Sequence, residues 1–574
     1  MDINNIKRYV TDHKFIDILV IIFIGIICTL LYSNHFSTIL PDRGREFYLA
    51  QKIMEGAVPY KDTTLIYFPL SYYINALIFK LAGVSINALL ISQAFLCIIY
   101  SILYYYLSKE FLERKTAFIL TFLIIVSCIF STSDLFSMIT PYSYARVYGL
   151  FAITGCIYSL IKLFKTNNIM MLYIAAILAG LSMSCKFEYV SAIFIICFAL
   201  FLYKKLSIKQ YIKSFLLLSV FPVITLSLLF IQGVSIKNIC DAIIYGIKFA
   251  STPVMTNFLS IAGTYPFDIN SKLQDFTSTF PYLIMVIIIC FCGLKLKLMY
   301  NNFQILILTS IIIWGTYYSY NIITYSWIII PYILLGICIF KYKNIIANDK
   351  TIFFLIVTAL LLSQREFFRL SLTFYGTYSF PLLILSFCVL IENSLPKKLL
   401  NIKIKDLLEF VLIIFIGFYI HNTVSSIRIT AFPLKTNKGT IYLDNYTKEV
   451  LGETIDYISN NIDKNATVLV LPEGNFINFI TDRNVDLKCF MLDRLYHDAY
   501  GEEKSRDLIA NTNSDYIILI DGLFIGDFHK AYLYSDDATL SAKYIENNYH
   551  LVKLINRKYI PDQYIKILKR NTNK

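Results

Sequence analysis

Charged residues are scarce in this sequence. Asp, Glu, Lys and Arg together make up 16% of its 574 residues, whereas soluble globular chains carry about 25%. Hydrophobic residues make up 57%, and they stand in repeated blocks of roughly 18 to 22 residues, the length that a helix needs to cross a hydrocarbon core. This composition excludes a soluble protein and predicts a polytopic α-helical membrane protein.

Cysteine and histidine motifs are also lacking. The chain has 12 Cys and 6 His, but its sequence contains no CxxC pair and no Cys/His cluster with the spacing of a zinc site. All the cysteines except Cys489 precede residue 425, mostly inside apolar blocks, where a cysteine usually acts as a small hydrophobic residue. We therefore expect neither a zinc site nor a disulfide framework.

The apolar blocks predict about thirteen spanning helices. We place them near residues 15–34, 85–107, 116–133, 142–163, 169–185, 187–203, 212–232, 281–299, 303–319, 322–340, 351–364, 371–391 and 407–424. Lys and Arg concentrate in the connections that face the cytoplasm if the N-terminus is cytoplasmic, in agreement with the positive-inside rule. The net charge of +13 thus reflects membrane topology, and we expect no nucleic acid partner.

Two domains are expected. Residues 1–424 form a transmembrane domain with large outer loops at about 35–84 and 233–280. Because the predicted number of spans is odd, a cytoplasmic N-terminus places residues 425–574 outside as a soluble extracytoplasmic domain.

This second domain has an ordinary soluble pattern. Ala466–Leu471 and Asp515–Asp521 are short β-branched runs bounded by turn residues, and such runs are typical of buried strands. The segments before and between them have helical periodicity, so we predict a small α/β domain with a partly parallel sheet. The "PEGNF" segment after the first strand is either a ligand loop or an ordinary turn bent at Gly474, and we favour the turn.

The first outer loop contains charges in an unusual place. The segment "PDRGREF" follows the first span within a few residues, and ionisable residues in or beside a bilayer are functional candidates because they are costly there. The stretches "REFYLAQKIMEG" and "PLSYYINALIFKLAG" predict two short helices along the membrane surface. Together they would form a platform with Asp42 at its edge.

The same segments carry a family resemblance. An acid just after the first span, followed by "A..I..G..PY.D" and "PL.YY..AL..K..G", resembles the GT-C superfamily of integral-membrane glycosyltransferases. The protein O-mannosyltransferase-like enzymes and the bacterial aminoarabinose–lipid A transferases are the most similar families. The sequence likeness covers roughly residues 15 to 190, and beyond it only the architecture is similar.

The resemblance implies an activity and a location. The chain would be an inverting glycosyltransferase with a polyprenyl-phosphate-linked sugar as donor and a lipid, glycan or protein of the envelope as acceptor. It would work at the outer face of the bacterial cytoplasmic membrane, among membrane lipids. We expect no certain cofactor and leave a divalent metal ion open.

Such a reaction needs a base and cations. It is a displacement at the anomeric carbon, in which a carboxylate takes the proton of the acceptor hydroxyl and positive charge stabilises the departing phosphate. The resemblance implies Asp42 as the general base, and Arg43 and Arg45 would keep it ionised or contact phosphate. Glu46 is either a second active-site carboxylate or a charge at a helix N-terminus.

Four cations are candidates for binding the donor phosphate. The resemblance assigns Lys186 this role, although its neighbour Glu188 could simply pair with it. Arg365 and Arg369 share one helix face by their spacing and could bind phosphate bidentately, or extend to the membrane interface. Arg146 is an intramembrane charge directed at the same cavity or at a structural acid.

The matching segments supply further candidates for substrate binding: Arg45, Tyr60, Lys61, Asp62, Tyr67 and Tyr142. The chain also departs from the family pattern. Arg43 stands where relatives often have a second acid, and Tyr67 and Phe68 stand where the aminoarabinose enzymes have Glu-Lys. Thr140 replaces the acid of an acid–proline pair, leaving Asp134 as the nearby acid. These departures put the sugar in doubt more than the reaction class.

Two other functions are compatible with many spans and buried charges. A multi-span polysaccharide polymerase or ligase usually has a large catalytic loop late in the chain, and the loop near 233–280 is long enough. A transporter or flippase of lipid-linked sugars would more often show paired halves, and the sequence has no internal repeat.

Overall fold

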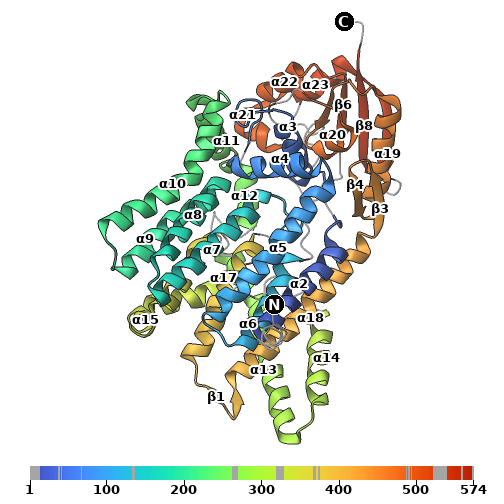
Figure 1. The fold of residues 1–574 in the computed structure, drawn as a ribbon. Coiled ribbons are helices and arrows are strands. Elements are labelled where there is room, and N and C mark those ends of the chain that lie inside the picture. The colour runs from blue at the N-terminus through green and yellow to red at the C-terminus, as the bar shows by residue number, and fades with distance from the viewer. Residues whose placement is uncertain are drawn as a thin grey trace, which may run out of the picture.

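The computed structural model describes residues 13–36, 39–40, 42–65, 67–131, 136–261, 269–318, 327, 329–365, 370, 372, 375–485, 488, 492, 494–520, 539–557 and 560–571. It consists of a bundle of helices with a smaller unit of strands and helices, formed by the end of the chain, against one end of the bundle (Figure 1). At that same end lie α3 (Arg43–Met54), α4 (Leu70–Ala82) and α11 (Ile236–Ala250).

Eight helices among the described residues are long and apolar enough to cross a membrane. They are α2 (His13–Tyr32), α5 (Ile86–Lys109), α7 (Tyr144–Thr166), α10 (Ile208–Ile231), α13 (Ile269–Tyr300), α15 (Ile330–Asn348), α17 (Gly376–Ser394) and α18 (Ile404–Ile429). Each overlaps a predicted span. The prediction of a polytopic α-helical membrane protein is therefore confirmed.

Most of the other predicted spans coincide with shorter apolar helices. These are α8 (Ile169–Cys185), α9 (Ser191–Tyr203) with the 3₁₀ turn η2 (Phe187–Val190) before it, α14 (Gln304–Tyr318) and α16 (Lys350–Leu362). The span predicted near 116–133 contains α6 (Arg114–Ile124) followed by one π-helical turn, η1 (Ile125–Ile129). The total of thirteen spans stays a prediction.

Both predicted helices of the first outer loop are present, as α3 and α4. The segment predicted as a second long outer loop, near 233–280, is largely helical. It contains α11, the short α12 (Pro253–Ile261) and the first turns of α13.

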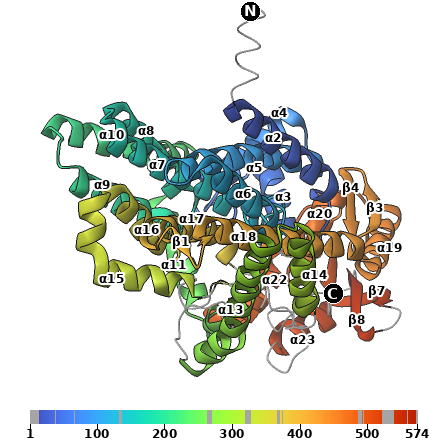
Figure 2. The same cartoon turned by 90° about the horizontal axis from the view of Figure 1, so that it is seen from below.

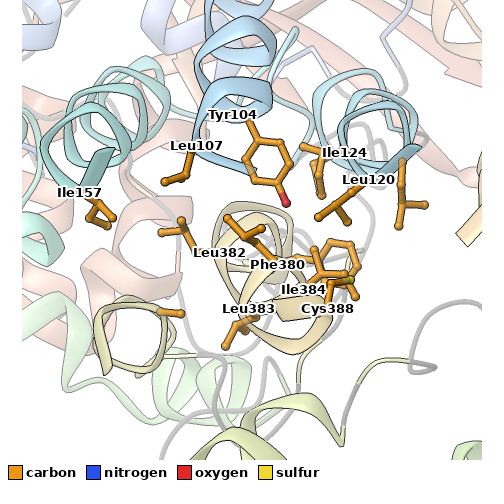
Figure 3. Packing of buried hydrophobic residues seen from close by; sticks show 14 of the residues in the cluster. Tyr104, Leu107, Leu120, Ile124, Ile157, Phe380, Leu382, Leu383, Ile384 and Cys388 are labelled. Carbon is orange, nitrogen blue, oxygen red and sulfur yellow. The ribbon is translucent and has the colours of Figure 1, made fainter. Parts of the chain in front are cut away.

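The bundle interior is packed with side chains from helices distant in the sequence. Figure 3 shows Tyr104 and Leu107 of α5 beside residues of α6, α7 and α17, all directed into one apolar cluster. Pro381 lies inside α17, and its carbonyl oxygen accepts a hydrogen bond of 2.7 Å from the Tyr104 hydroxyl. The only polar atom drawn in this cluster therefore has a partner, as a buried hydroxyl requires.

The periphery of the bundle is apolar as well. In Figures 1 and 2, α13 and α14 extend together from the rest of the bundle as a hairpin. Ile307, Leu308 and Ile311 on α14 are more than half exposed. On a soluble protein such a surface would mark a binding site or an aggregation hazard, whereas on a membrane protein it faces lipid.

The end of the chain forms the predicted small α/β unit. Its elements are β3 (Phe432–Thr436), β4 (Gly439–Leu443), α19 (Asn445–Asn461), β5 (Val468–Leu471), α20 (Asn475–Thr481), α21 (Arg494–Tyr500), α22 (Glu502–Asn511), β6 (Tyr516–Ile520), α23 (Thr539–Asn548), β7 (Tyr549–Arg557) and β8 (Ile560–Arg570). A separate two-residue pairing joins β1 (Lys398–Leu399) and β2 (Ile402–Lys403).

The main sheet of this unit has the order β5-β6-β8-β7. The two predicted strands pair in parallel as β5 and β6, while β8 pairs antiparallel with both β6 and β7. The prediction of a partly parallel sheet is therefore confirmed. The β7–β8 hairpin was not predicted.

Candidate active site

Asp42 stands at the start of α3, at the edge of the first outer loop. Its backbone has φ 32° and ψ −65°, a conformation that is strained for a residue with a side chain, and such strain concentrates at functional sites. The side chain is 27% exposed. Its carboxylate is thus accessible to a ligand while the backbone that carries it is held in an unusual conformation.

Arg45 joins Asp42 to a second carboxylate. One guanidinium nitrogen lies 2.5 Å from Oδ1 of Asp42, and another lies 2.7 Å from Oε1 of Glu473. The backbone N–H of Asp42 also donates to Oε1 of Glu473, at 3.0 Å. Burial alone would lower the pKa of Arg45, but the charges of Glu473 and Asp42 outweigh it and raise that pKa above its usual value.

Glu46 faces the interior behind Asp42. Its side chain is fully buried, and its Oε2 accepts a bond of 3.4 Å from the amide of Asn75, whose own oxygen accepts from the Tyr148 hydroxyl at 2.7 Å. Burial raises the pKa of Glu46 to about 8, against the opposing charge of Arg45. Glu46 is therefore mostly protonated at neutral pH and poorly suited to be the base.

Arg43 is buried and points away from the Asp42 carboxylate. Its Nε donates to the backbone oxygen of Thr140 at 2.8 Å, and its guanidinium lies 5.5 Å from the ring centre of Phe36. Two residues at which the chain departs from the family pattern, Arg43 and Thr140, are therefore direct neighbours.

Three of the cations proposed for phosphate binding converge on one carboxylate. Arg146 and Arg365 each form an ion pair with Glu188, and the Nζ of Lys186 lies 3.3 Å from the same side chain. We call Arg146, Lys186 and Arg365 the cation cluster. Because the two guanidinium groups alone outnumber the single carboxylate, the cluster keeps an excess of positive charge near Glu188.

Tyrosines line the cation cluster and connect it to Asp42. The Nζ of Lys186 donates to the Tyr142 hydroxyl at 2.6 Å and lies 4.6 Å from the ring centre of Tyr67. Burial raises the pKa of Tyr67, and the charge of Asp42 raises it further. Tyr375 contacts the cluster as well, with the guanidinium carbon of Arg365 3.6 Å from its ring centre. Tyr67 is thus close to both the candidate base and the cation cluster.

The remaining candidates from the first outer loop lie apart from this centre. Tyr60 supports Tyr67 by donating its hydroxyl to the Tyr67 backbone oxygen at 3.1 Å. Lys61 and Asp62 are exposed, and Asp62 accepts the backbone N–H of Val58 at 2.8 Å, which closes a local turn. Arg369 and Asp134 lie outside the described residues.

Glu473 is the functional candidate that the sequence did not reveal. It belongs to "PEGNF", which follows β5, and its side chain is 1% exposed. The signal in the sequence was an acid and Gly474 directly after the carboxyl end of a predicted strand. This signal also fits an ordinary turn, which was favoured because nothing in the sequence connects Glu473 to Asp42. The described residues contain no group of three or more His, Cys, Asp or Glu arranged to hold a metal ion.

Part of the chain matches a known protein family. Residues 66–229 match the family model of the dolichyl-phosphate-mannose-protein mannosyltransferases. The predicted resemblance to the GT-C glycosyltransferases is confirmed. The matched segment contains Tyr67, Tyr142, Arg146 and Lys186, so most of the cation cluster falls within it. Comparison with curated protein sequences gave no significant match.

Several solved structures align with most of the chain. ArnT from Cupriavidus metallidurans bound to undecaprenyl phosphate is 9% identical, with 97% of this chain and 98% of that chain covered and a TM-score of 0.45. The Archaeoglobus fulgidus oligosaccharyltransferase in complex with Zn and sulfate is 12% identical, with 92% and 71% covered and a TM-score of 0.47. AglB of the same organism, with an inhibitory peptide and a dolichol-phosphate, is 11% identical, with 88% and 69% covered and a TM-score of 0.39.

Proposed function

We propose that this protein is an inverting glycosyltransferase that moves a sugar from a polyprenyl-phosphate donor to an envelope acceptor. The observation that carries the proposal is that an accessible carboxylate, Asp42, and the cation cluster are both close to one side chain, Tyr67. A carboxylate next to concentrated positive charge is what a displacement at a phosphate-linked anomeric carbon needs.

The proposed reaction follows from these positions. Asp42 accepts the proton of the acceptor hydroxyl, and the acceptor oxygen forms a new bond to the anomeric carbon of the sugar. The bond from that carbon to the phosphate oxygen breaks, and its electron pair stays on the phosphate. Lys186, Arg146 and Arg365 stabilise the added negative charge, and the polyprenyl tail remains among the membrane lipids.

The proposed location is the outer side of a bacterial cytoplasmic membrane, with the N-terminus in the cytoplasm. The chain would divide into residues 1–424, the transmembrane domain, and 425–574, the extracytoplasmic domain. The bond between Arg45 of α3 and Glu473 near the end of the chain supports the proposal that the first outer loop and the second domain lie on the same side.

The proposal is tested by mass spectrometry of envelope glycolipids and glycans from cells with and without the gene. Strains without it should lose one sugar modification, and the wild-type gene should restore it. Asp42→Asn keeps the shape of the side chain but removes the base, and positioned general-base catalysis contributes typically 10²–10⁴-fold, so turnover should fall by about that factor.

Glu55→Gln is the matched control. It removes an exposed carboxylate from the end of the same helix, one that pairs with Lys52, and should restore the modification. Full complementation by Asp42→Asn would contradict the assignment of the base. An unchanged set of envelope sugars, with altered transport of lipid-linked sugars instead, would favour a flippase.

A further inference from the structure

The second domain enters the candidate active site through Glu473. Oε1 of Glu473 accepts two bonds, one from Arg45 at 2.7 Å and one from the backbone N–H of Asp42 at 3.0 Å. The two carboxylates that contact Arg45 thus come from positions 431 residues apart in the chain. Hydrogen bonds that involve ionised groups are stronger than hydrogen bonds between neutral groups.

The contact is part of a closely packed interface. A Cβ atom on Gly44 would lie 2.6 Å from Cβ of Phe476 and 2.8 Å from its backbone N, so α3 and α20 approach more closely than any other residue would allow. Phe479 stacks on Phe47, with ring centres 5.4 Å apart. The position of Glu473 relative to α3 is therefore fixed by packing and does not depend on its ion pair alone.

From this geometry we infer that Glu473 is a positioning residue for the transfer reaction, so that the second domain supplies part of the active site. This inference rests on the proposed function. Glu473 accepts a hydrogen bond from the backbone N–H of Asp42. This bond helps to keep the Asp42 backbone at its strained φ, which sets the direction of the Asp42 side chain. Glu473 also forms an ion pair with Arg45 through a guanidinium nitrogen that does not contact Asp42.

The ion pair with Glu473 affects how strongly Arg45 binds the Asp42 carboxylate. With Glu473 present, the guanidinium uses separate nitrogens for the two carboxylates. Without it, a buried guanidinium would be left with Asp42 as its remaining carboxylate partner, and it would compete more strongly with the acceptor hydroxyl for that carboxylate. Removing Glu473 should therefore reduce turnover more than donor binding.

The experiment uses the full-length protein in nanodiscs, with turnover measured on the envelope substrate identified by mass spectrometry and with undecaprenyl phosphate as the binding probe. Glu473→Ala should lower kcat about ten- to a hundred-fold, the range for losing a hydrogen bond to a charged group, and leave binding of the probe within about threefold. Glu473→Gln retains an acceptor oxygen for both donors and should recover most of the loss.

The control variant separates positioning from domain attachment. Lys438→Met breaks bonds between the same domain and α3, since Nζ of Lys438 donates to Gln51 at 2.9 Å, but it touches neither Asp42 nor Arg45. It should keep kcat near the wild-type value. A loss of kcat equal to that of Glu473→Ala would show that domain attachment is what matters and would overturn the inference.

A double-mutant cycle provides a second readout. If Glu473 acts through Arg45, then Arg45→Ala and Glu473→Ala together should be little worse than Arg45→Ala alone, because residues of one network are not additive. Full activity of Glu473→Ala alongside an inactive Asp42→Asn would reject this inference only. Full activity of Asp42→Asn would contradict the assignment of the base, and an unchanged set of envelope sugars in cells without the gene would reject the proposed function itself.

Discussion

We predict that the buried carboxyl of Glu46 has a different role from the carboxylate of Asp42. Its ordinary pKa is near 4.5, and burial raises it to about 8 in the folded protein. The unfolded chain therefore ionises above pH 4.5 while the folded protein stays protonated until about pH 8. A raised pKa of this kind makes the free energy of unfolding fall as the pH rises through that window.

The size of the effect follows from the width of the window. Each pH unit between the two pKa values is worth about 1.36 kcal/mol, so about 3 kcal/mol of stability is lost between pH 4.5 and pH 7. Glu46→Gln has a neutral side chain of the same shape that does not titrate. The variant should match the wild type near pH 4.5 and exceed it by about 3 kcal/mol at neutral pH.

The assay is thermal unfolding of the full-length protein in detergent from pH 4.5 to pH 9. Glu55→Gln, at the exposed end of α3, controls for the removal of a charge from this helix. Since Glu46 is already mostly protonated at pH 7, its Gln variant should also lose less turnover than Asp42→Asn. A stability difference that does not change with pH, or a Gln variant that is as inactive as Asp42→Asn, would refute the reasoning.

Two further predictions concern the donor and the topology. Lys186→Met removes one cation from the cluster and should weaken binding of undecaprenyl phosphate about ten- to a hundred-fold, with folding in detergent preserved; unchanged affinity would leave Lys186 as a structural partner of Glu188. Lys543→Cys, on exposed α23, should react with an impermeant maleimide on intact spheroplasts, and reaction only after lysis would reverse the proposed orientation.

Much of the fold could be predicted because a bilayer constrains sequence strongly. A spanning helix must be long and apolar, and each of the eight long helices overlaps a predicted span. The short helices were harder to assign. Leu70–Ala82 has only 13 residues, and it was assigned to the first outer loop from its motif and not from its hydropathy.

The site could be predicted only where its residues share a segment or a family motif. Lys186 and Glu188 are two residues apart, so their pairing was foreseeable, but Arg146 and Arg365 reach the same carboxylate from α7 and from the segment after α16. The contact between Glu473 and Arg45 spans 428 positions. Nothing local encodes such a contact, because it results from how the second domain packs on α3.

The two departures at Arg43 and Thr140 are best understood as one change. A buried guanidinium needs acceptors, and Thr140 provides its backbone oxygen at 2.8 Å together with its hydroxyl at 3.5 Å. Arg43 is thus accommodated by the segment in which the family pattern also differs. Asp42 and the cation cluster, which carry the proposed chemistry, are not altered by this exchange. Arg43 directly follows the candidate base in the sequence, and we expect this chain to differ from its relatives in the sugar it accepts.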